Sequence, residues 1–219
     1  MEISNLAKTN FRNQNQAFGI KQVDRLFHMH ILGQTGTGKT TLLENIIRQD
    51  IESGRGVCLV DPHGDLVKRI FERTPMSRKS DVVYLDLTDE NLHLGYNPLK
   101  KVSYENRALV ASGMIEVFKK LWHDAWGSRL EHILRNTLLA LLDQPRATVN
   151  DILPMLFDKS FRIGAIEHIE NDDVKLFWTK EFPRYSPESV MPVANKIGGF
   201  VSYPKTKRLL IENTEMISF

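Results

Sequence analysis

Eight consecutive residues have the types and the spacing that bind a polyphosphate. Residues 33–40 read Gly-Gln-Thr-Gly-Thr-Gly-Lys-Thr, a full match to the phosphate-loop pattern G-x-x-x-x-G-K-[ST]. The glycines let the backbone turn its N–H groups toward phosphates, Lys39 reaches the β- and γ-phosphates, and the Thr40 hydroxyl is placed to bind Mg²⁺. Lys39 is also the candidate catalytic residue. The pattern predicts a nucleoside triphosphate site formed by Gly33, Gln34, Thr35, Gly36, Thr37, Gly38, Lys39, Thr40 and Thr41.

The segments on either side of this loop predict the strand–loop–helix unit in which the pattern works. Residues 26–32 carry apolar side chains at positions 27, 29, 31 and 32, which favours a mostly buried strand. Residues 41–48 carry them at positions 42, 43, 46 and 47, which form one face of a helix. The loop then lies at the positive end of that helix, where anions bind.

Strands and helices are predicted to alternate through the first part of the chain. Apolar runs at 56–61 and 81–86 predict two further strands, with a helix near 65–71 between them. Such alternation implies parallel strands covered on both faces. Residues 17–102 are therefore predicted to form an α/β nucleotide-binding part with a partial parallel sheet, and the polar residues 1–16 an N-terminal arm.

Residues 103–219 are predicted to form an all-helical insertion. Helix-start signals recur at Ser103, Ser128, Thr148, Asn171 and Ser186. The helix from Ser128 has one apolar face, formed by Leu130, Ile133, Leu134, Leu138 and Leu141. The pair Gly198-Gly199 predicts the end of the last of these helices. Because no convincing parallel strand follows Asp86, the predicted fold class is a P-loop, RecA-like α/β sheet truncated before its Walker B strand, followed by helices.

The composition is that of an ordinary globular protein. The net charge is +2 and no basic block indicates nucleic acid, so any DNA contact must come from local clusters. Cys58, the single cysteine, lies in an apolar run and is predicted to be a buried structural thiol. No apolar stretch approaches the length of about 18 residues typical of a membrane span, so a cytoplasmic location is expected.

Two aspartates end apolar runs, as the Mg²⁺-binding aspartate of ATPases does. Asp61 and Asp86 are candidates to hold Mg²⁺ through water, but neither is followed by the glutamate that polarises the attacking water in ATP-driven motors. Asp61 opens the run Asp-Pro-His-Gly-Asp, in which Asp61, His63 and Asp65 are candidates for the vicinity of the γ-phosphate. The alternative for these residues is a turn and a helix cap.

The C-terminal part holds the best candidate for contact with the DNA backbone. Between positions 184 and 208 a single acid, Glu188, stands against five basic residues, which are Arg184, Lys196, Lys205, Lys207 and Arg208. Clustered Lys and Arg bind DNA phosphates whatever the sequence. Lys205, Lys207 and Arg208 are therefore the predicted DNA contacts.

Three segments together resemble a known superfamily. They are residues 30–40 with the phosphate loop, residues 56–65 ending in Asp-Pro-His-Gly-Asp, and Tyr96-Asn97-Pro98-Leu99. The resemblance is to the conjugative DNA-transfer branch of the HerA–FtsK superfamily, the TraD-type coupling ATPases of type IV secretion, and to HerA-like helicases. Residues 129–136 also look like the helical segment that follows in these proteins, so the resemblance covers about residues 17–219.

The resemblance implies a RecA-like motor that assembles as a hexameric ring and drives DNA through its centre with ATP and Mg²⁺. The implied partners are DNA, further copies of the chain and components of type IV secretion or the relaxosome, at the cytoplasmic face of the inner membrane if the protein carries an anchor. Family members place a Walker B Asp-Glu, a sensor and an arginine finger after the helical insertion. The sequence ends at Phe219 before such a segment, so we expect an N-terminal piece of a longer protein or a truncated reading frame.

Two other classes of protein stay open. A small P-loop group-transfer kinase would use Asp61 for its metal and the helical part as a lid, with Arg129 and Arg135 as candidates to close on the phosphates. A nucleotide-binding module without hydrolysis would need only the phosphate loop. DNA-stimulated ATP turnover distinguishes the motor from both, and phosphoryl transfer to a metabolite identifies the kinase.

Overall fold

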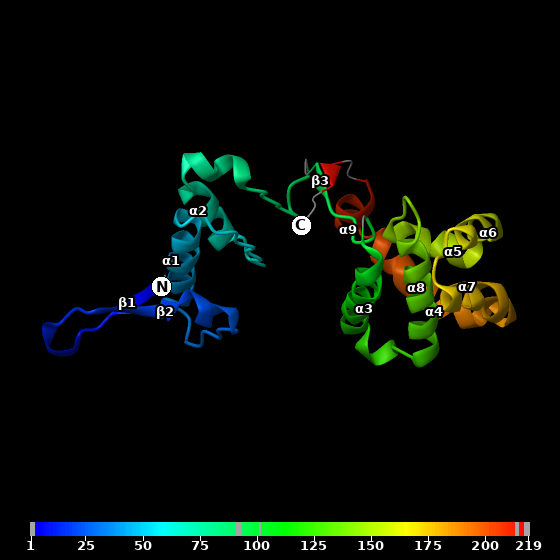
Figure 1. Cartoon of the computed structure of the whole chain (residues 1–219), viewed down its shortest axis with the longest axis horizontal. Helices are drawn as coiled ribbons and strands as arrows, with labels where there is room; N and C mark the ends of the chain where they lie inside the picture. The colour runs from blue at the N-terminus through cyan, green and yellow to red at the C-terminus, as the bar shows by residue number, and fades with distance from the viewer. Residues whose placement is uncertain (1–2, 91–92, 101, 213–214, 217–219) are drawn as a thin grey trace. The chain divides into compact units, whose positions relative to one another are not determined.

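Residues 1–86 and residues 87–219 each pack as a unit of their own (Figure 1). The computed structural model describes residues 3–90, 93–100, 102–212 and 215–216. The sequence analysis put the start of the helical part at residue 103, whereas the structure assigns the preceding residues from Leu87 to the helical unit. In the part of the chain that the structure describes, no helix has both the length and the apolar composition that crossing a membrane requires.

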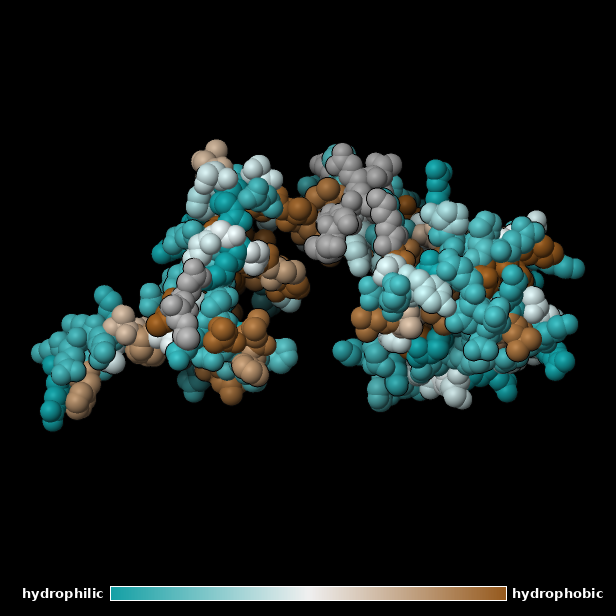
Figure 2. Space-filling view, viewed as in Figure 1, coloured by the Kyte–Doolittle hydropathy of each residue, from teal (hydrophilic) through white to brown (hydrophobic). Residues whose placement is uncertain are grey.

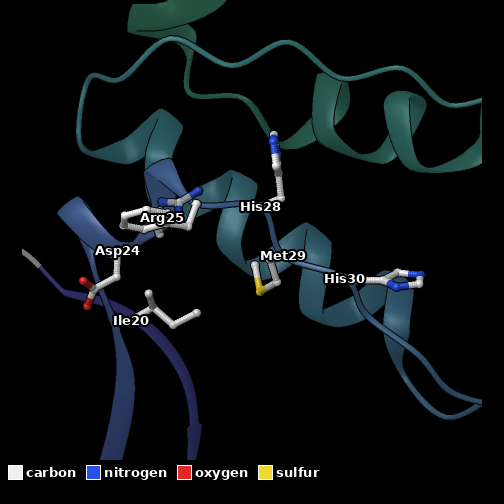
Figure 3. A pocket seen from close by; sticks show the side chains of 7 residues that line it. Ile20, Asp24, Arg25, His28, Met29 and His30 are labelled. Carbon is white, nitrogen blue, oxygen red and sulfur yellow. The ribbon is translucent and has the colours of Figure 1, made fainter.

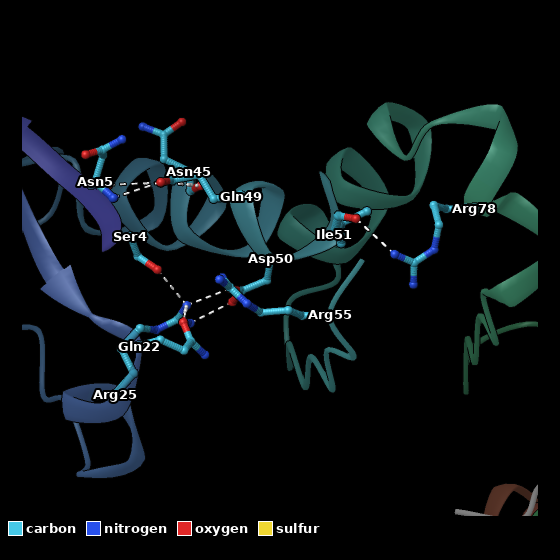
Figure 4. Close-up of polar contacts among 10 residues, drawn as sticks. All are labelled: Ser4, Asn5, Gln22, Arg25, Asn45, Gln49, Asp50, Ile51, Arg55 and Arg78. Carbon is cyan, nitrogen blue, oxygen red and sulfur yellow. Dashed lines mark hydrogen bonds and ion pairs between the residues drawn. The ribbon is translucent and has the colours of Figure 1, made fainter. Parts of the chain in front are cut away.

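The first unit opens with a hairpin where the sequence predicted a polar arm. Strand β1 (Ile3–Lys8) pairs antiparallel with β2 (Ala17–Lys21). The Gln49 side chain on helix α1 (Lys39–Glu52) accepts a hydrogen bond from the Asn5 N–H at 2.8 Å and donates one to the Asn5 carbonyl at 2.9 Å (Figure 4). The hairpin is thus fastened to α1 by two bonds that satisfy an outward-facing peptide group of β1.

Two buried acidic residues of α1 hold the neighbouring elements. Asp50 accepts two hydrogen bonds of 2.6 Å from Arg25, in the 3₁₀ turn η2 (Gln22–Leu26), and one of 2.9 Å from Arg55 (Figure 4). Nearly two turns closer to the helix start, Glu44 forms ion pairs with two arginines of α2 (Asp65–Arg73), Arg69 and Arg73. A final 3₁₀ turn, η3 (Met76–Asp81), ends the regular structure of this unit.

The three predicted parallel strands are not confirmed. Over residues 27–32, 56–60 and 82–86 the chain has no ladder partner among the described residues. None of their apolar side chains is buried, and several are largely exposed, with Phe27 77% and Val60 84% accessible; Figure 2 shows apolar patches on the surface of this unit. Cys58 is exposed as well, so the prediction of a buried thiol is wrong. An apolar pattern indicates that a segment is suited to the interior of a sheet. It does not determine whether neighbouring strands are present to pair with it.

The Asp50 cluster makes the stability of the first unit depend on pH. The hydrogen bond from Arg25, opposed by burial and aided by the bond from Arg55, holds the pKa of the Asp50 carboxyl below its usual value. Because the folded-state pKa is the lower one, this stabilisation is complete above the unfolded-state pKa of about 3.9 and is lost as the pH falls through the folded-state pKa. We expect hydrogen exchange of residues 1–86, corrected for intrinsic rates, to show protection falling below about pH 4, and falling less steeply in Asp50→Asn.

The second unit is helical, as predicted. Its elements are β3 (Leu94–Gly95), α3 (Tyr104–Leu121), η4 (His123–Ala125), α4 (Ser128–Leu142), η5 (Val149–Asp151), α5 (Ile152–Phe157), α6 (Lys159–Glu167), α7 (Asp172–Leu176), the π-helical turn η6 (Phe177–Glu181), η7 (Phe182–Arg184), α8 (Pro187–Ser202), α9 (Pro204–Lys207), the π-helical turn η8 (Arg208–Glu212) and β4 (Glu215–Met216). Helices α3 and α8 each pack against α4 (Figure 1), and β3 pairs parallel with β4.

Local signals in the sequence mark several of these helix starts. Ser103 and Ser186 precede α3 and α8, and Thr148 with Asp151 forms a reciprocal capping box at η5. The Asn171 side chain accepts the first amides of α7. The predicted stop at Gly198-Gly199 is wrong, because α8 continues to Ser202 with Ile197 and Val201 buried on both sides of the pair. Burial of the apolar face outweighs the low helix propensity of glycine here.

Helix α4 supplies the centre of the core in this unit. All five residues of its predicted apolar face are buried, and they pack with α5, α8 and Trp178. The Trp178 indole is 1% exposed and donates to the Asn136 carbonyl at 3.2 Å. Asn97 of the Asn-Pro-Leu segment donates to the Ala147 carbonyl at 2.7 Å and accepts from the Leu99 N–H at 3.0 Å. This segment therefore fixes the loop before α3 to the loop after α4.

Candidate functional site: the phosphate loop

The loop over residues 33–38 has the backbone that its sequence predicts. Gly36 and Gly38 have φ of 84° and 92°, a region that residues with a Cβ rarely adopt, and α1 begins immediately after Gly38. A Cβ added at Gly33 would lie 2.6 Å from the Thr37 hydroxyl oxygen, so a larger residue here would displace the Thr37 side chain from its place against the loop. The sequence pattern thus located both the turn and the helix start.

Two side chains hold the loop closed on itself. The Lys39 ammonium donates to the carbonyl oxygens of Gly33 at 2.8 Å and Gln34 at 2.7 Å. The Thr37 hydroxyl donates to the same Gln34 carbonyl at 2.8 Å. Lys39 therefore already lies over the loop that would surround a phosphate. To bind a nucleotide, the Lys39 ammonium exchanges the two neutral carbonyl oxygens for phosphate oxygens. Hydrogen bonds to phosphate are stronger because both partners are charged.

The loop fits a polyphosphate and Mg²⁺ on these observations. The first turn of α1 contains no acidic residue, so the positive end of the helix and Lys39 act together on an anion. Thr40, the second residue of α1, is exposed, as is Thr41. Among the residues that the structure describes, no group of three or more His, Cys, Asp or Glu side chains is placed to bind a metal. Thr40 is therefore the residue that would hold Mg²⁺, whose remaining ligands are commonly phosphate oxygens and water.

The Asp-Pro-His-Gly-Asp run forms a turn that starts α2. The Asp61 carboxylate accepts from the N–H of His63 at 3.0 Å and from that of Leu66 at 2.8 Å, and Gly64 has φ of 82°. Desolvation raises the pKa of the Asp61 carboxyl, but backbone N–H bonds, led by that of His63, hold it below its usual value. The Asp61 carboxylate thus satisfies an N-terminal amide of α2, whose N-cap residue is Gly64. In the described part of the chain, no hydrogen bond or ion pair joins this turn to the phosphate loop, so the γ-phosphate role of Asp61, His63 and Asp65 stays a prediction.

The predicted DNA contacts lie at the end of the helical unit. Lys205 and Lys207 belong to α9, and Lys207 forms an ion pair of 2.7 Å with Glu212. Arg208 donates to the Asp89 carbonyl at 3.1 Å. Lys205 is exposed. The structure brings the three residues together, with two of them already bonded within the unit.

The kinase alternative depended on arginines of α4. Arg135 donates to Ser112 at 3.0 Å and to Glu131 at 3.2 Å, so it links α4 to α3. The sequence analysis missed a second network on this helix, in which His132 Nε2 lies 2.9 Å from a Glu181 oxygen that also accepts from the Tyr185 hydroxyl at 2.6 Å. Glu181 is 49 positions away in sequence from His132, so no spacing rule could have paired them.

The sequence matches the family described as "Helicase HerA, central domain" over residues 22–160, which is more than half of the chain. The chain belongs to this family. The match includes the phosphate loop, α1, α2 and the Asp61 turn, and it ends at the second residue of α6. No curated protein and no solved structure matches the sequence significantly.

Membership of the HerA central-domain family confirms part of the sequence analysis. It places the chain in the HerA/FtsK superfamily of P-loop ATPases, which belongs to the motor class of these ATPases. The matched region of this HerA-type chain begins at Gln22, in η2, and includes the extended segment that leads into the loop.

Proposed function

We propose that this chain is the nucleotide-binding part of a DNA-translocating motor, which binds ATP with Mg²⁺ at residues 33–41 and acts as a ring of identical subunits. The observation that carries the proposal is the loop geometry, in which glycines with positive φ lead into a helix start and Lys39 lies over the loop. Membership of the HerA family supports the motor class.

Within the superfamily we favour the conjugative DNA-transfer branch over other HerA-like functions. The Asp61 turn and the Asn97 segment, which carried that resemblance, both have defined structural roles: Asp61 accepts an N-terminal amide of α2, and Asn97 bonds to the loop after α4. A test is DNA transfer in cells: loss of conjugation in a Lys39→Ala strain, with DNA repair unaffected, supports this branch. The reverse result identifies a HerA-like repair function.

Direct titration calorimetry of the full chain with ATP tests the nucleotide site. We expect one site per chain, with affinity that depends on Mg²⁺. Phosphate release with and without duplex DNA tests the motor class, since stimulation by DNA is expected of a translocase and of neither alternative. Phosphoryl transfer to a metabolite would overturn the proposal in favour of a kinase.

Replacing Thr40 with alanine should remove the Mg²⁺-dependent part of ATP binding only. The hydroxyl is the metal ligand, whereas the loop amides and Lys39 bind phosphate directly. ATP titrations in Mg²⁺ and in EDTA are compared, and Ser77→Ala, which removes an exposed hydroxyl of η3 outside the loop, is the matched control. Equal losses in the two buffers would show that Thr40 acts structurally.

DNA binding should be weak, independent of sequence and steeply dependent on salt, because a chain of net charge +2 offers only local basic clusters. Lys205→Ala should reduce the slope of log affinity against log salt by about one, the value for one phosphate contact. Lys159→Ala, an exposed lysine of α6, is the control. Fluorescence anisotropy over a salt series measures both, and equal slopes for the two variants would place the DNA contacts elsewhere.

A further inference from the structure

The hairpin of β1 and β2 projects from the first unit. Gln49 of α1 holds it at Asn5, and Figure 1 shows it extending away from the helix to a turn at its far end. Every residue from Asn10 to Gly19 is exposed. The turn, residues 9–16, is named here the hairpin tip, and it is accessible to a binding partner.

The charged side chains of the hairpin are all basic. Residues 3–21 include Lys8, Arg12 and Lys21 and no acidic residue, and these three charges exceed the net charge of +2 of the whole chain. In the part of the chain that the structure describes, none of the three forms an ion pair. The next acidic residue along the chain, Asp24, lies at the foot of the hairpin near Ile20 (Figure 3). The hairpin therefore attracts a polyanion.

The hairpin tip presents an aromatic ring next to one of these cations. Phe11 is 66% exposed, and the Arg12 guanidinium lies 5.0 Å from the centroid of its ring. This cation–π contact holds the ring in place. Exposed rings in a basic surface are the platforms on which proteins stack unpaired bases. Because a base inside a duplex is already stacked on its neighbours, the ring favours a single strand.

Amide side chains surround Phe11 and separate two possible partners. A surface of anionic lipid would also suit a ring flanked by basic residues. Insertion into lipid, however, would bury amide groups without hydrogen-bond partners, which is costly. The edge of an unpaired base offers them both donors and acceptors. These amides favour nucleic acid, and they belong to Asn10, Asn13, Gln14, Asn15 and Gln16.

The backbone of the hairpin tip is closed by its own hydrogen bonds. The Thr9 N–H donates to the Gln16 carbonyl at 2.9 Å, and the Gln16 N–H donates to the Thr9 hydroxyl at 3.1 Å. Between them Arg12, Asn13 and Asn15 have φ of 50°, 58° and 42°. Asparagine adopts such values more readily than other residues with a Cβ, so Arg12 is the strained one. Strained residues cluster at functional sites, and this one contacts Phe11.

We propose that the hairpin binds single-stranded nucleic acid, with Phe11 stacking on a base and Lys8, Arg12 and Lys21 contacting phosphates. The site lies in the first unit and is separate from the Lys205 cluster of the helical unit. It needs no nucleotide at the phosphate loop. It rests on the proposed function in one respect, which is that DNA is taken as the nucleic acid.

The stacking contact is tested by fluorescence anisotropy of the full chain with a labelled oligothymidine of 30 nucleotides. Phe11→Ala should weaken binding about tenfold, as expected for the loss of one stacked base. Phe11→Trp should retain binding, because a stacking ring is kept. Phe157→Ala removes a ring of α5 that is 54% exposed, and should leave the affinity unchanged.

The phosphate contacts are tested by repeating these titrations over a salt series. The double variant Lys8→Ala, Lys21→Ala should reduce the slope of log affinity against log salt by about 1.4, which is about 0.7 for each phosphate contact of a single strand. The matched control is Lys68→Ala, Lys159→Ala, which removes two exposed lysines outside the hairpin and should leave the slope unchanged.

Three results overturn the hairpin site. They are no binding of oligothymidine by the unaltered chain at low salt, equal affinities of Phe11→Ala and Phe157→Ala, and Phe11-dependent binding that is confined to duplex DNA. Phe11-dependent binding to phosphatidylserine vesicles in place of the oligonucleotide identifies a membrane contact instead. Preference for oligouridine of the same length retains the nucleic-acid site and rejects DNA as its partner.

The outcome is separable from that of the proposed function. Hairpin variants without effect, in a chain whose phosphate release duplex DNA stimulates, reject the hairpin site and retain the motor. Weaker oligothymidine binding in the hairpin variants of a chain whose phosphate release DNA does not stimulate supports the hairpin site and rejects the motor.

Discussion

Replacing Lys39 with alanine is expected to weaken ATP binding by about 100-fold or more. The ammonium makes charge-assisted hydrogen bonds to the phosphates, and two such bonds contribute on the order of 3 kcal/mol. The fold should be unaffected, because Lys39 bonds only to two carbonyl groups of an exposed loop. Calorimetric titration with MgATP measures the loss of affinity, and thermal melting verifies the fold.

Lys68→Ala provides the matched control for this experiment. Lys68 is an exposed lysine of α2 in the same unit and lies outside the loop, so its removal changes the net charge equally. ATP affinity that is the same in the Lys39 variant, the Lys68 variant and the unaltered chain would remove the basis of the nucleotide site.

Asp50→Ala is expected to destabilise the first unit by about 3 kcal/mol, because it leaves two largely buried arginines without their shared carboxylate. The side chains of Arg25 and Arg55 are 19% and 22% exposed, so neither can recover full hydration without moving. All three tryptophans lie beyond residue 121, in the other unit, so fluorescence would not report this change. Hydrogen exchange should show protection in β1, β2 and α1 falling roughly 100-fold.

The comparison for this variant is Asp81→Ala, which breaks an exposed pair. Asp81 accepts from Arg78 at 2.8 Å with more than half of its side chain exposed, and such a surface pair contributes at most about 1 kcal/mol. Equal effects of the two variants on hydrogen exchange would mean that the Asp50 cluster is no stronger than a solvated ion pair.

What the sequence predicted well was local in the chain. The phosphate loop needs glycine at positions set by its own backbone, and Gly36 and Gly38 do have positive φ. Helices α3 and α8 begin one residue after Ser103 and Ser186, as the sequence predicted, and α7 begins after Asn171, whose side chain accepts two of its first amides. The apolar face of α4 follows from helical periodicity alone.

What it missed depends on segments far apart in the chain. Arg25 and Asp50 join across 25 positions and His132 and Glu181 across 49, and no spacing predicts either pair. The pattern at 56–61 was read as a buried strand, yet a strand is completed only by hydrogen bonds to a neighbour. The hairpin of β1 and β2 was missed for a related reason, because its pairing bridges a polar loop in a segment with little apolar periodicity.

The bonds from Lys39 and Thr37 to the loop's own carbonyl groups have a consequence for nucleotide exchange. Because these two side chains hold the turn from within, its shape does not depend on an incoming anion. When nucleotide binds, the Lys39 ammonium exchanges the Gly33 and Gln34 carbonyl oxygens for phosphate oxygens, and when nucleotide leaves it returns to the carbonyl oxygens. A motor built on such a loop can release one nucleotide and bind the next without refolding the phosphate loop between cycles.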